Sequence, residues 1–100
     1  MPLKVVRSPR AKRDAFDIWD YVSADSPRGA ERQLRRINTV VAMLAERPEA
    51  GRGREDLGAD IRSFPCLSYI VFYRHSRTTL TIIRILHAAR DISAQTLSDD

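Results

Sequence analysis

The hydrophobic residues in the first part of the chain recur at helical spacing. An apolar segment at residues 3–7 predicts a short strand, and Ser8 with Pro9 then predicts a helix start. Serine accepts a hydrogen bond from an unpaired backbone N–H, and proline tolerates the first helical position. The apolar positions that follow form one stripe: Ala11, Ala15, Ile18, Trp19 and Val22. We therefore expect Trp19 to be buried between the helices and the sheet, with Asp14, Asp17 and Asp20 largely off the stripe.

A second stripe follows the same start signal. Ser26 and Pro27 precede apolar residues at spacings of four, three, four and three, namely Ala30, Leu34, Ile37, Val41 and Leu44. This helix should end before Pro48, because the residue that precedes a proline disfavours helical geometry. Only a few residues separate the two predicted helices, so they should form an antiparallel hairpin.

The pattern changes after a glycine-bearing loop at residues 48–58. Residues 60–64, 69–74 and 79–87 are typical of strands, residues 75–78 of a turn, and residues 91–97 of a short helix or a frayed end. This order predicts an α+β fold. An N-terminal strand precedes the antiparallel two-helix hairpin, and a three-stranded antiparallel segment completes one sheet before a short C-terminal tail. We expect a single domain over residues 1–100.

The last predicted strand is apolar on both sides. Simple alternation places Thr81, Ile83 and Ile85 on one face, and on the other Leu80, Ile82, Arg84 and Leu86. A strand with one face in water would not carry aliphatic residues on both. Something should cover the second face, either the chain's own tail or a partner.

Charge is distributed unevenly along the chain. Residues 1–54 carry 12 Lys and Arg against 7 Asp and Glu, whereas residues 55–100 carry 5 against 6. The basic part indicates an anionic partner, either nucleic acid or an acidic protein segment, although a solvated helix face explains it equally well. For the arginines at positions 28, 32, 35 and 36, a solvated face is the favoured interpretation over phosphate binding.

Several classes of protein and site are disfavoured. The lone Cys66 excludes an intramolecular disulfide and fits a reducing cytoplasm. The longest apolar run, residues 69–73, is far too short for a membrane span, and the N-terminus lacks a signal peptide's apolar segment. We therefore expect a cytoplasmic protein with no membrane partner. Two histidines and one cysteine offer no metal-ligand spacing, and no cofactor is indicated.

Several segments together resemble the RelE/ParE toxin superfamily, and its ParE branch in particular. They are residues 18–22 (IWDYV), Ser26-Pro27 with Ala30, residues 47–52 (RPEAGR), residues 62–65 (RSFP), residues 69–74 (YIVFYR) and residues 86–91 (LHAARD). The resemblance covers nearly the whole chain in order and spacing.

The resemblance implies a small toxin with two helices on a sheet, neutralised by an antitoxin encoded beside it. A ParE-like toxin would have a ParD-like, ribbon-helix-helix antitoxin whose C-terminal segment wraps it, and would contact DNA only through that antitoxin. Its implied target is DNA gyrase. A RelE-like toxin would instead cleave messenger RNA in the ribosome.

The residues that carry RNA cleavage in the RelE branch are mostly missing. Asp60 and Ile70 stand where a strand lysine and a strand arginine are expected, and Thr96 falls near an expected tail tyrosine. Arg90 alone matches. We therefore expect a non-catalytic inhibitor, with His87 and Arg90 as the candidates if the protein is an RNase. A degenerate toxin that acts only as a co-repressor is a further alternative.

Three arginines are candidates for binding the antitoxin. Arg62, Arg74 and Arg84 lie on predicted strands, and each guanidinium could bind an acidic segment through bidentate contacts. Taken singly, an ordinary surface role fits each of them equally well.

Overall fold

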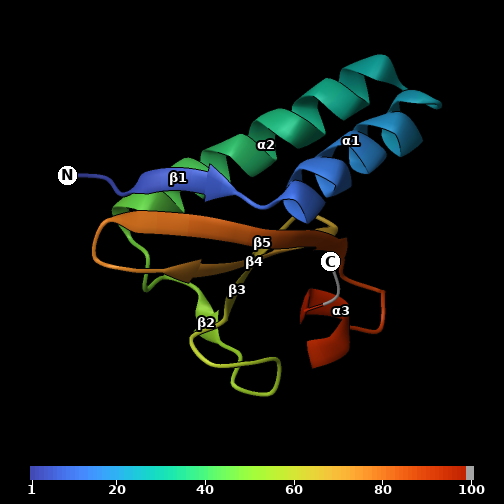
Figure 1. Ribbon diagram of the computed structural model, residues 1–100. Helices are drawn as coiled ribbons and strands as arrows, with labels where there is room; N and C mark the ends of the chain where they lie inside the picture. Colours follow the sequence, from blue (N-terminus) through green and yellow to red (C-terminus); the bar gives the residue numbers. More distant parts are fainter. Residues whose placement is uncertain (99–100) are drawn as a thin grey trace.

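Two helices cover one face of a five-stranded sheet in the computed structural model, which describes residues 1–98 (Figure 1). The elements are β1 (Lys4–Arg7), α1 (Pro9–Ser23), α2 (Pro27–Glu46), β2 (Arg52–Gly53), β3 (Arg62–Cys66), β4 (Tyr69–His75), β5 (Thr79–His87) and α3 (Ala94–Ser98). The α+β class, the N-terminal strand and the helix hairpin are confirmed. The sequence missed the two-residue strand β2, and β3 begins two residues later than expected.

Both helices begin as the sequence predicts. The Ser8 hydroxyl accepts a hydrogen bond from the Ala11 N–H at 3.0 Å, and the Ser26 hydroxyl accepts one from the Gly29 N–H at 2.9 Å. Proline occupies the first turn of each helix. Helix α2 ends at Glu46, before Pro48. The hairpin is therefore encoded locally, by caps and apolar spacing.

The sheet has the strand order β1-β5-β4-β3-β2. The edge strand β1 is parallel to β5, and every other neighbouring pair is antiparallel. The hairpin connects β1 to the rest of the sheet and packs on one of its faces (Figure 1). The core between hairpin and sheet includes Ile18, Ile37, Val41, Leu44, Val71, Tyr73, Leu80, Ile82 and Ile85.

A β-bulge in β5 changes the expected alternation. Phe72 is opposite Arg84, whereas the next residue, Tyr73, is opposite Ile82, so Ile83 is the extra residue. Ile82 consequently faces the hairpin instead of sharing a face with Leu86, and the expected grouping of Ile82 with Arg84 and Leu86 is wrong. Simple counting failed because a bulge shifts the side-chain phase by one residue.

The second face, by which we mean the sheet face opposite the hairpin, is covered by the chain's own loop and tail. Leu57 and Ile61 from the β2–β3 loop, and Leu97 from α3, form a buried cluster with Phe72 and Leu86. Figure 1 shows α3 on the side of the sheet away from α1 and α2. The tail thus supplies part of the cover that the apolar strand requires. Neither this short helix nor any other in residues 1–98 has the length and apolarity of a membrane span.

The prediction that Trp19 is buried is wrong. Its side chain remains 37% exposed, and the buried positions of α1 are Ala11, Asp14 and Ile18. Those three positions, at i, i+3 and i+7, define the face that packs on the sheet. Trp19 lies about 100° around the helix from Ile18, which puts it on the flank. Asp14, expected off the apolar stripe, is buried instead.

Candidate functional site

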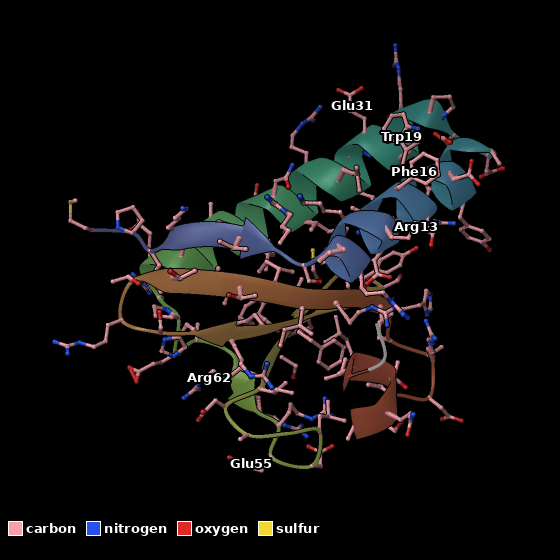
Figure 2. All side chains as sticks on the ribbon, in the orientation of Figure 1. Arg13, Phe16, Trp19, Glu31, Glu55 and Arg62 are labelled. Carbon is pink, nitrogen blue, oxygen red and sulfur yellow. The ribbon has the colours of Figure 1, made fainter. Side chains whose placement is uncertain are left out.

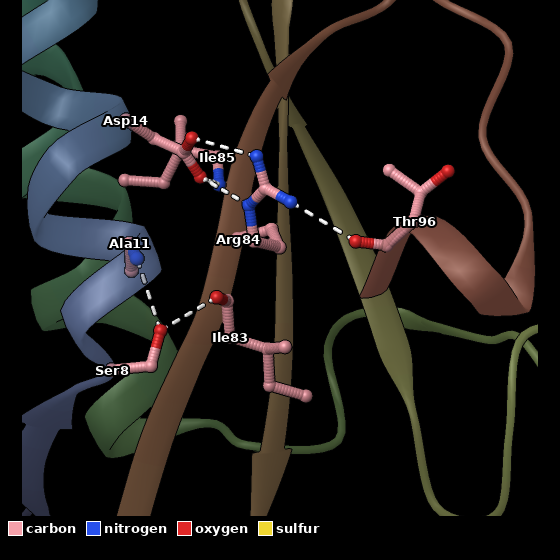
Figure 3. A network of polar contacts seen from close by, with 7 residues as sticks. All are labelled: Ser8, Ala11, Asp14, Ile83, Arg84, Ile85 and Thr96. Carbon is pink, nitrogen blue, oxygen red and sulfur yellow. Dashed lines mark hydrogen bonds and ion pairs between the residues drawn. The ribbon is translucent and has the colours of Figure 1, made fainter. Parts of the chain in front are cut away.

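Arg84 lies in the interior and forms a buried ion pair with Asp14 (Figure 3). Its Nε donates to Asp14 Oδ2 at 2.7 Å and its Nη2 to Asp14 Oδ1 at 2.9 Å. The Ile85 N–H also donates to Asp14 Oδ2, at 2.9 Å. With Arg84 only 4% exposed, its guanidinium is not displayed to a partner, which does not fit the expectation that it binds an antitoxin.

The same guanidinium connects α1 to the C-terminal tail. Arg84 Nη1 donates to the Thr96 carbonyl in α3 at 3.0 Å. On the other side, the Ser8 hydroxyl donates to the Ile83 carbonyl at 2.7 Å while it caps α1 (Figure 3). Helix α1, the bulged part of β5 and α3 are therefore joined by polar contacts. The role of Arg84 is to hold these elements together.

Arg62 and Arg74 point to opposite faces of the sheet. Arg62 is opposite Tyr73 in the strand register, and Arg74 directly follows Tyr73, so their side chains alternate. Arg62 Nη1 donates to the Gly51 carbonyl at 2.9 Å, and Arg74 Nε donates to the Ala59 carbonyl at 3.3 Å. The structure therefore does not bring the three candidate arginines into one cluster.

Arg74 borders a hollow on the second face. The hollow has a volume of about 320 Å³ and is lined by Ser8, Leu57, Ile61, Arg74, Thr81, Ile83, Ala94 and Leu97. We call it the Arg74 hollow. Its lining is mainly apolar with one cation at the rim. That combination suits a protein segment that inserts apolar side chains and presents a carboxylate.

Arg62 borders a different hollow, of about 570 Å³. Its lining includes Glu55, Asp60, Ile61 and His75 besides Arg62. The carboxylates oppose binding of an anionic partner at this hollow. Asp60, at the position of the missing strand lysine, lies in the exposed β2–β3 loop with a φ of 61°. Sequence reasoning had not singled out His75 for this site.

The two candidates for RNA cleavage lie at and just after the end of β5. The His87 ring packs edge-on against Tyr69 at 5.3 Å between centroids, and its Nδ1 accepts a hydrogen bond from the Ala89 N–H at 3.0 Å. Arg90 is exposed in the turn that follows β5, where its N–H donates to the His87 carbonyl. These contacts give His87 a structural role at the end of β5.

Burial favours the protonated forms of one thiol and two phenols in the core. Burial raises the pKa of the Cys66 thiol above its ordinary value of 9.0, with Arg36 opposing the shift, and burial raises the pKa of Tyr69 and Tyr73. The Tyr73 hydroxyl donates to the Pro48 carbonyl at 2.8 Å and accepts from the Gly51 N–H at 2.8 Å. A Cβ at Gly51 would collide with this hydroxyl. The phenol therefore fixes the loop that leads into β2, and neither it nor the thiol is poised as a nucleophile. Within residues 1–98, no three His, Cys, Asp or Glu side chains gather as metal ligands would.

Sequence reasoning missed the aromatic side chains on the outside of the hairpin. Phe16 is 61% exposed, and together with Trp19 it projects from α1 on the side away from the sheet (Figure 2). Aromatic rings left in water are enriched at protein interfaces. Phe16 does not belong to the apolar stripe of this helix, and an aromatic residue off that stripe was the feature of the sequence that could have revealed an exposed ring.

Comparison with known proteins gives a consistent result. A family model described as the ParE toxin of the type II toxin–antitoxin system parDE matches residues 5–92. Toxin ParE1 of Caulobacter vibrioides is 36% identical over 90 residues, which cover 87% of this chain and 91% of that protein. Toxin RelE2 of the same organism is 36% identical over 87 residues, covering 87% and 97%.

Two solved structures share the fold. One is a chain of the chromosomal ParDE system of P. aeruginosa, with a TM-score of 0.72, 22% identity, and coverage of 85% of this chain and 95% of that one. The other belongs to the RelBE2 toxin–antitoxin complex of Mycobacterium tuberculosis, with a TM-score of 0.62, 22% identity, and coverage of 87% and 99%. At this identity, the likeness supports the arrangement of helices and strands alone.

Proposed function

Because the chain belongs to the ParE toxin family of type II toxin–antitoxin systems, we propose that it is a non-catalytic inhibitor of DNA gyrase, neutralised by a ParD-like antitoxin. The toxin class follows from the family. The gyrase target, the lack of catalysis and the ParD-like character of the antitoxin are the proposed part.

The observation that carries the proposal is the apolar second face of the sheet. RNA cleavage needs an acid, a base and cations arranged around a phosphate. On this face Phe72, Leu86 and Leu97 are buried together, and Ile70, at the position of a catalytic arginine, packs against them. Arg84, a cation on β5, is occupied by Asp14. Apolar side chains packed at these positions do not supply the acid, base and cations that RNA cleavage needs, which supports a toxin that acts without catalysis.

The Arg74 hollow is the proposed antitoxin site. An antitoxin segment that is disordered alone would insert apolar side chains beside Ile83 and Leu97 and place a carboxylate against Arg74. Arg62 is not part of this site, because it points to the other face of the sheet and borders a hollow that also contains Glu55 and Asp60. Ordering the segment costs free energy, so the full contact must extend beyond this hollow.

The gyrase proposal is tested with the purified toxin and its cognate antitoxin. The toxin alone should inhibit gyrase supercoiling of a relaxed plasmid and increase double-strand cleavage, and stoichiometric antitoxin should restore the reaction. The same preparation should leave messenger RNA intact on translating ribosomes.

A clear alternative outcome exists, because a relative of similar identity is named Toxin RelE2. Codon-specific cleavage of ribosome-bound messenger RNA that Arg90→Ala abolishes would replace the gyrase proposal with the RNase one. Growth that is unaffected by toxin expression would instead favour a protein that acts only as a co-repressor.

The antitoxin site is tested by charge reversal. Arg74→Glu should weaken antitoxin binding about tenfold or more, because it replaces an ion pair with a repulsive one. Arg77→Glu, an exposed change in the β4–β5 turn, is the matched control and should have little effect. Hydrogen exchange should show antitoxin-dependent protection of β5 and α3. Protection confined to other elements, with Arg74→Glu binding as tightly as wild type, would place the antitoxin elsewhere.

A further inference from the structure

A second hollow lies on the helix side of the molecule, between α2 and the β3–β4 turn. It has a volume of about 520 Å³ and is lined by Arg32, Arg35, Arg36, Thr39 and Leu67, all exposed. We call it the α2 hollow. It has no lining residue in common with the Arg74 hollow. The two hollows are therefore separate sites on the surface.

Leu67 occupies a backbone position that suits glycine. Cys66 pairs with Tyr69, so Leu67 and Ser68 form a two-residue turn, and Leu67 has a φ of 57°. A left-handed first residue in such a turn is normally glycine, because a Cβ is strained there. Leu67 is nevertheless a large aliphatic side chain that is 64% exposed. Neither backbone geometry nor burial accounts for it, whereas a contact with a partner would.

Arg32 and Arg36 of α2 line the hollow together with Leu67, and Arg28 lies one turn before them in the helix. Arg28, Arg32 and Arg36 are spaced by four residues, so they lie in a row on one side of the helix. Within residues 1–98 the ion pairs include Arg35 with Glu31, but none of these three arginines. Like charges at this spacing weaken a helix slightly, so the row does not stabilise α2. It is suited to a run of carboxylates, which guanidinium groups bind through paired hydrogen bonds.

We propose that the Arg28–Arg32–Arg36 row and Leu67 form a binding surface for an acidic protein segment that carries an aliphatic side chain. The carboxylates of the segment lie along the arginine row, and its aliphatic side chain packs on Leu67 in the α2 hollow. Leu67 favours protein over nucleic acid as the partner, because an aliphatic side chain of a protein segment can pack on it, whereas a sugar–phosphate backbone has no comparable aliphatic group to bury. Because the surface shares no lining residue with the Arg74 hollow, filling that hollow does not by itself cover it.

The proposal is tested by titrating the toxin with a fluorescein-labelled ten-residue peptide of Glu and Asp with one central Leu, at low salt. Leu67→Gly should weaken binding about tenfold, which corresponds to losing an apolar contact, and should keep the fold, because glycine suits this turn. The double variant Arg32→Gln with Arg36→Gln should weaken it at least as much. Arg77→Gln, an exposed change in the β4–β5 turn that lines neither hollow, is the matched control and should bind as wild type does. A peptide with Ser in place of Leu should bind wild type as weakly as the original peptide binds Leu67→Gly.

Two results would overturn the proposal. One is that the wild-type toxin does not bind the peptide, or that Leu67→Gly leaves the affinity for the peptide unchanged. The other is tighter binding of a single-stranded or duplex DNA oligonucleotide of matched charge, also insensitive to Leu67→Gly, which would make the arginine row a phosphate-binding surface. The peptide assay requires neither gyrase nor antitoxin, so its outcome is independent of the proposed function.

Discussion

Removing one partner of the buried Asp14–Arg84 pair should destabilise the protein severely. Arg84→Met deletes both charged hydrogen bonds, of 2.7 Å and 2.9 Å, and leaves the Asp14 carboxylate buried with the Ile85 N–H as its remaining donor. Breaking one side of a buried ion pair costs about 3–5 kcal/mol. A domain of this size has roughly 5–15 kcal/mol in total, so the single variant should retain only part of its stability.

Replacing both partners should restore much of what one replacement removes. In Asp14→Leu with Arg84→Met no charge remains uncompensated, and apolar substitution of a buried pair is often close to neutral. The double variant should therefore recover more than half of the larger single loss. Some cost should persist, because the buried Ile85 N–H loses its Asp14 acceptor and the contact from Arg84 to the Thr96 carbonyl is also lost.

The assay is urea-induced unfolding of the isolated toxin, followed by circular dichroism at constant pH. Arg13→Met is the matched control, because Arg13 pairs with Asp17 at 3.3 Å on the exposed side of α1. Such surface pairs contribute about 0.3–0.5 kcal/mol. If Arg84→Met costs no more than this control, or if the effects of the two single replacements simply add in the double variant, Asp14 and Arg84 are not coupled and the reasoning is wrong.

The other predictions use the same unfolding assay. Tyr73→Phe should cost about 1–3 kcal/mol, because the Gly51 N–H loses its buried acceptor, whereas Tyr21→Phe on the surface should change nothing measurable. Trp19→Ala should cost about 1 kcal/mol instead of the 3–5 kcal/mol typical of a core aromatic, and a core-like value would contradict the exposed ring. Leu67→Gly should stabilise the protein by roughly 0.5–1 kcal/mol through relief of the left-handed strain, and a loss of stability would refute that strain. Above pH 9.0 stability should fall as pH rises, because the buried thiol and phenol retain protons that the unfolded chain releases at their ordinary values of 9.0 and 10.0. Cys66→Ala should remove the part of that slope that begins near pH 9, and an unchanged slope would exclude the thiol as its source.

The features that the sequence predicted correctly are those with local causes. Ser8 and Ser26 cap their helices through contacts three residues away, and Pro48 limits α2 from two residues beyond its end. The strands follow runs of branched and aromatic residues. For such features the interacting groups are close in the sequence, so spacing alone carries the information.

The features that the sequence misplaced depend on distant partners. The carboxylate of Asp14 is buried because Arg84, 70 residues later, neutralises it, and no periodicity reveals that pairing. The bulge at Ile83 depends on how β4 and β5 align, so alternation within β5 could not locate it. Trp19 has the spacing of a core residue, and only the orientation of α1 on the sheet decides that it does not belong to the core.

The bulge also links the ion pair to the proposed antitoxin site. Because Ile83 is the extra residue, Ile82 faces the hairpin while Arg84, two residues on, reaches both Asp14 in α1 and the Thr96 carbonyl in α3. Helix α3 in turn supplies Ala94 and Leu97 to the Arg74 hollow. A loss of antitoxin affinity in an Arg84 variant would therefore report a displaced α3, whereas the same loss in an Arg74 variant with unchanged stability would report a direct contact. Stability and affinity must be measured on the same variants to distinguish the roles of the two arginines, because Arg84 supports α3 in the wall of the hollow whereas Arg74 is part of its rim.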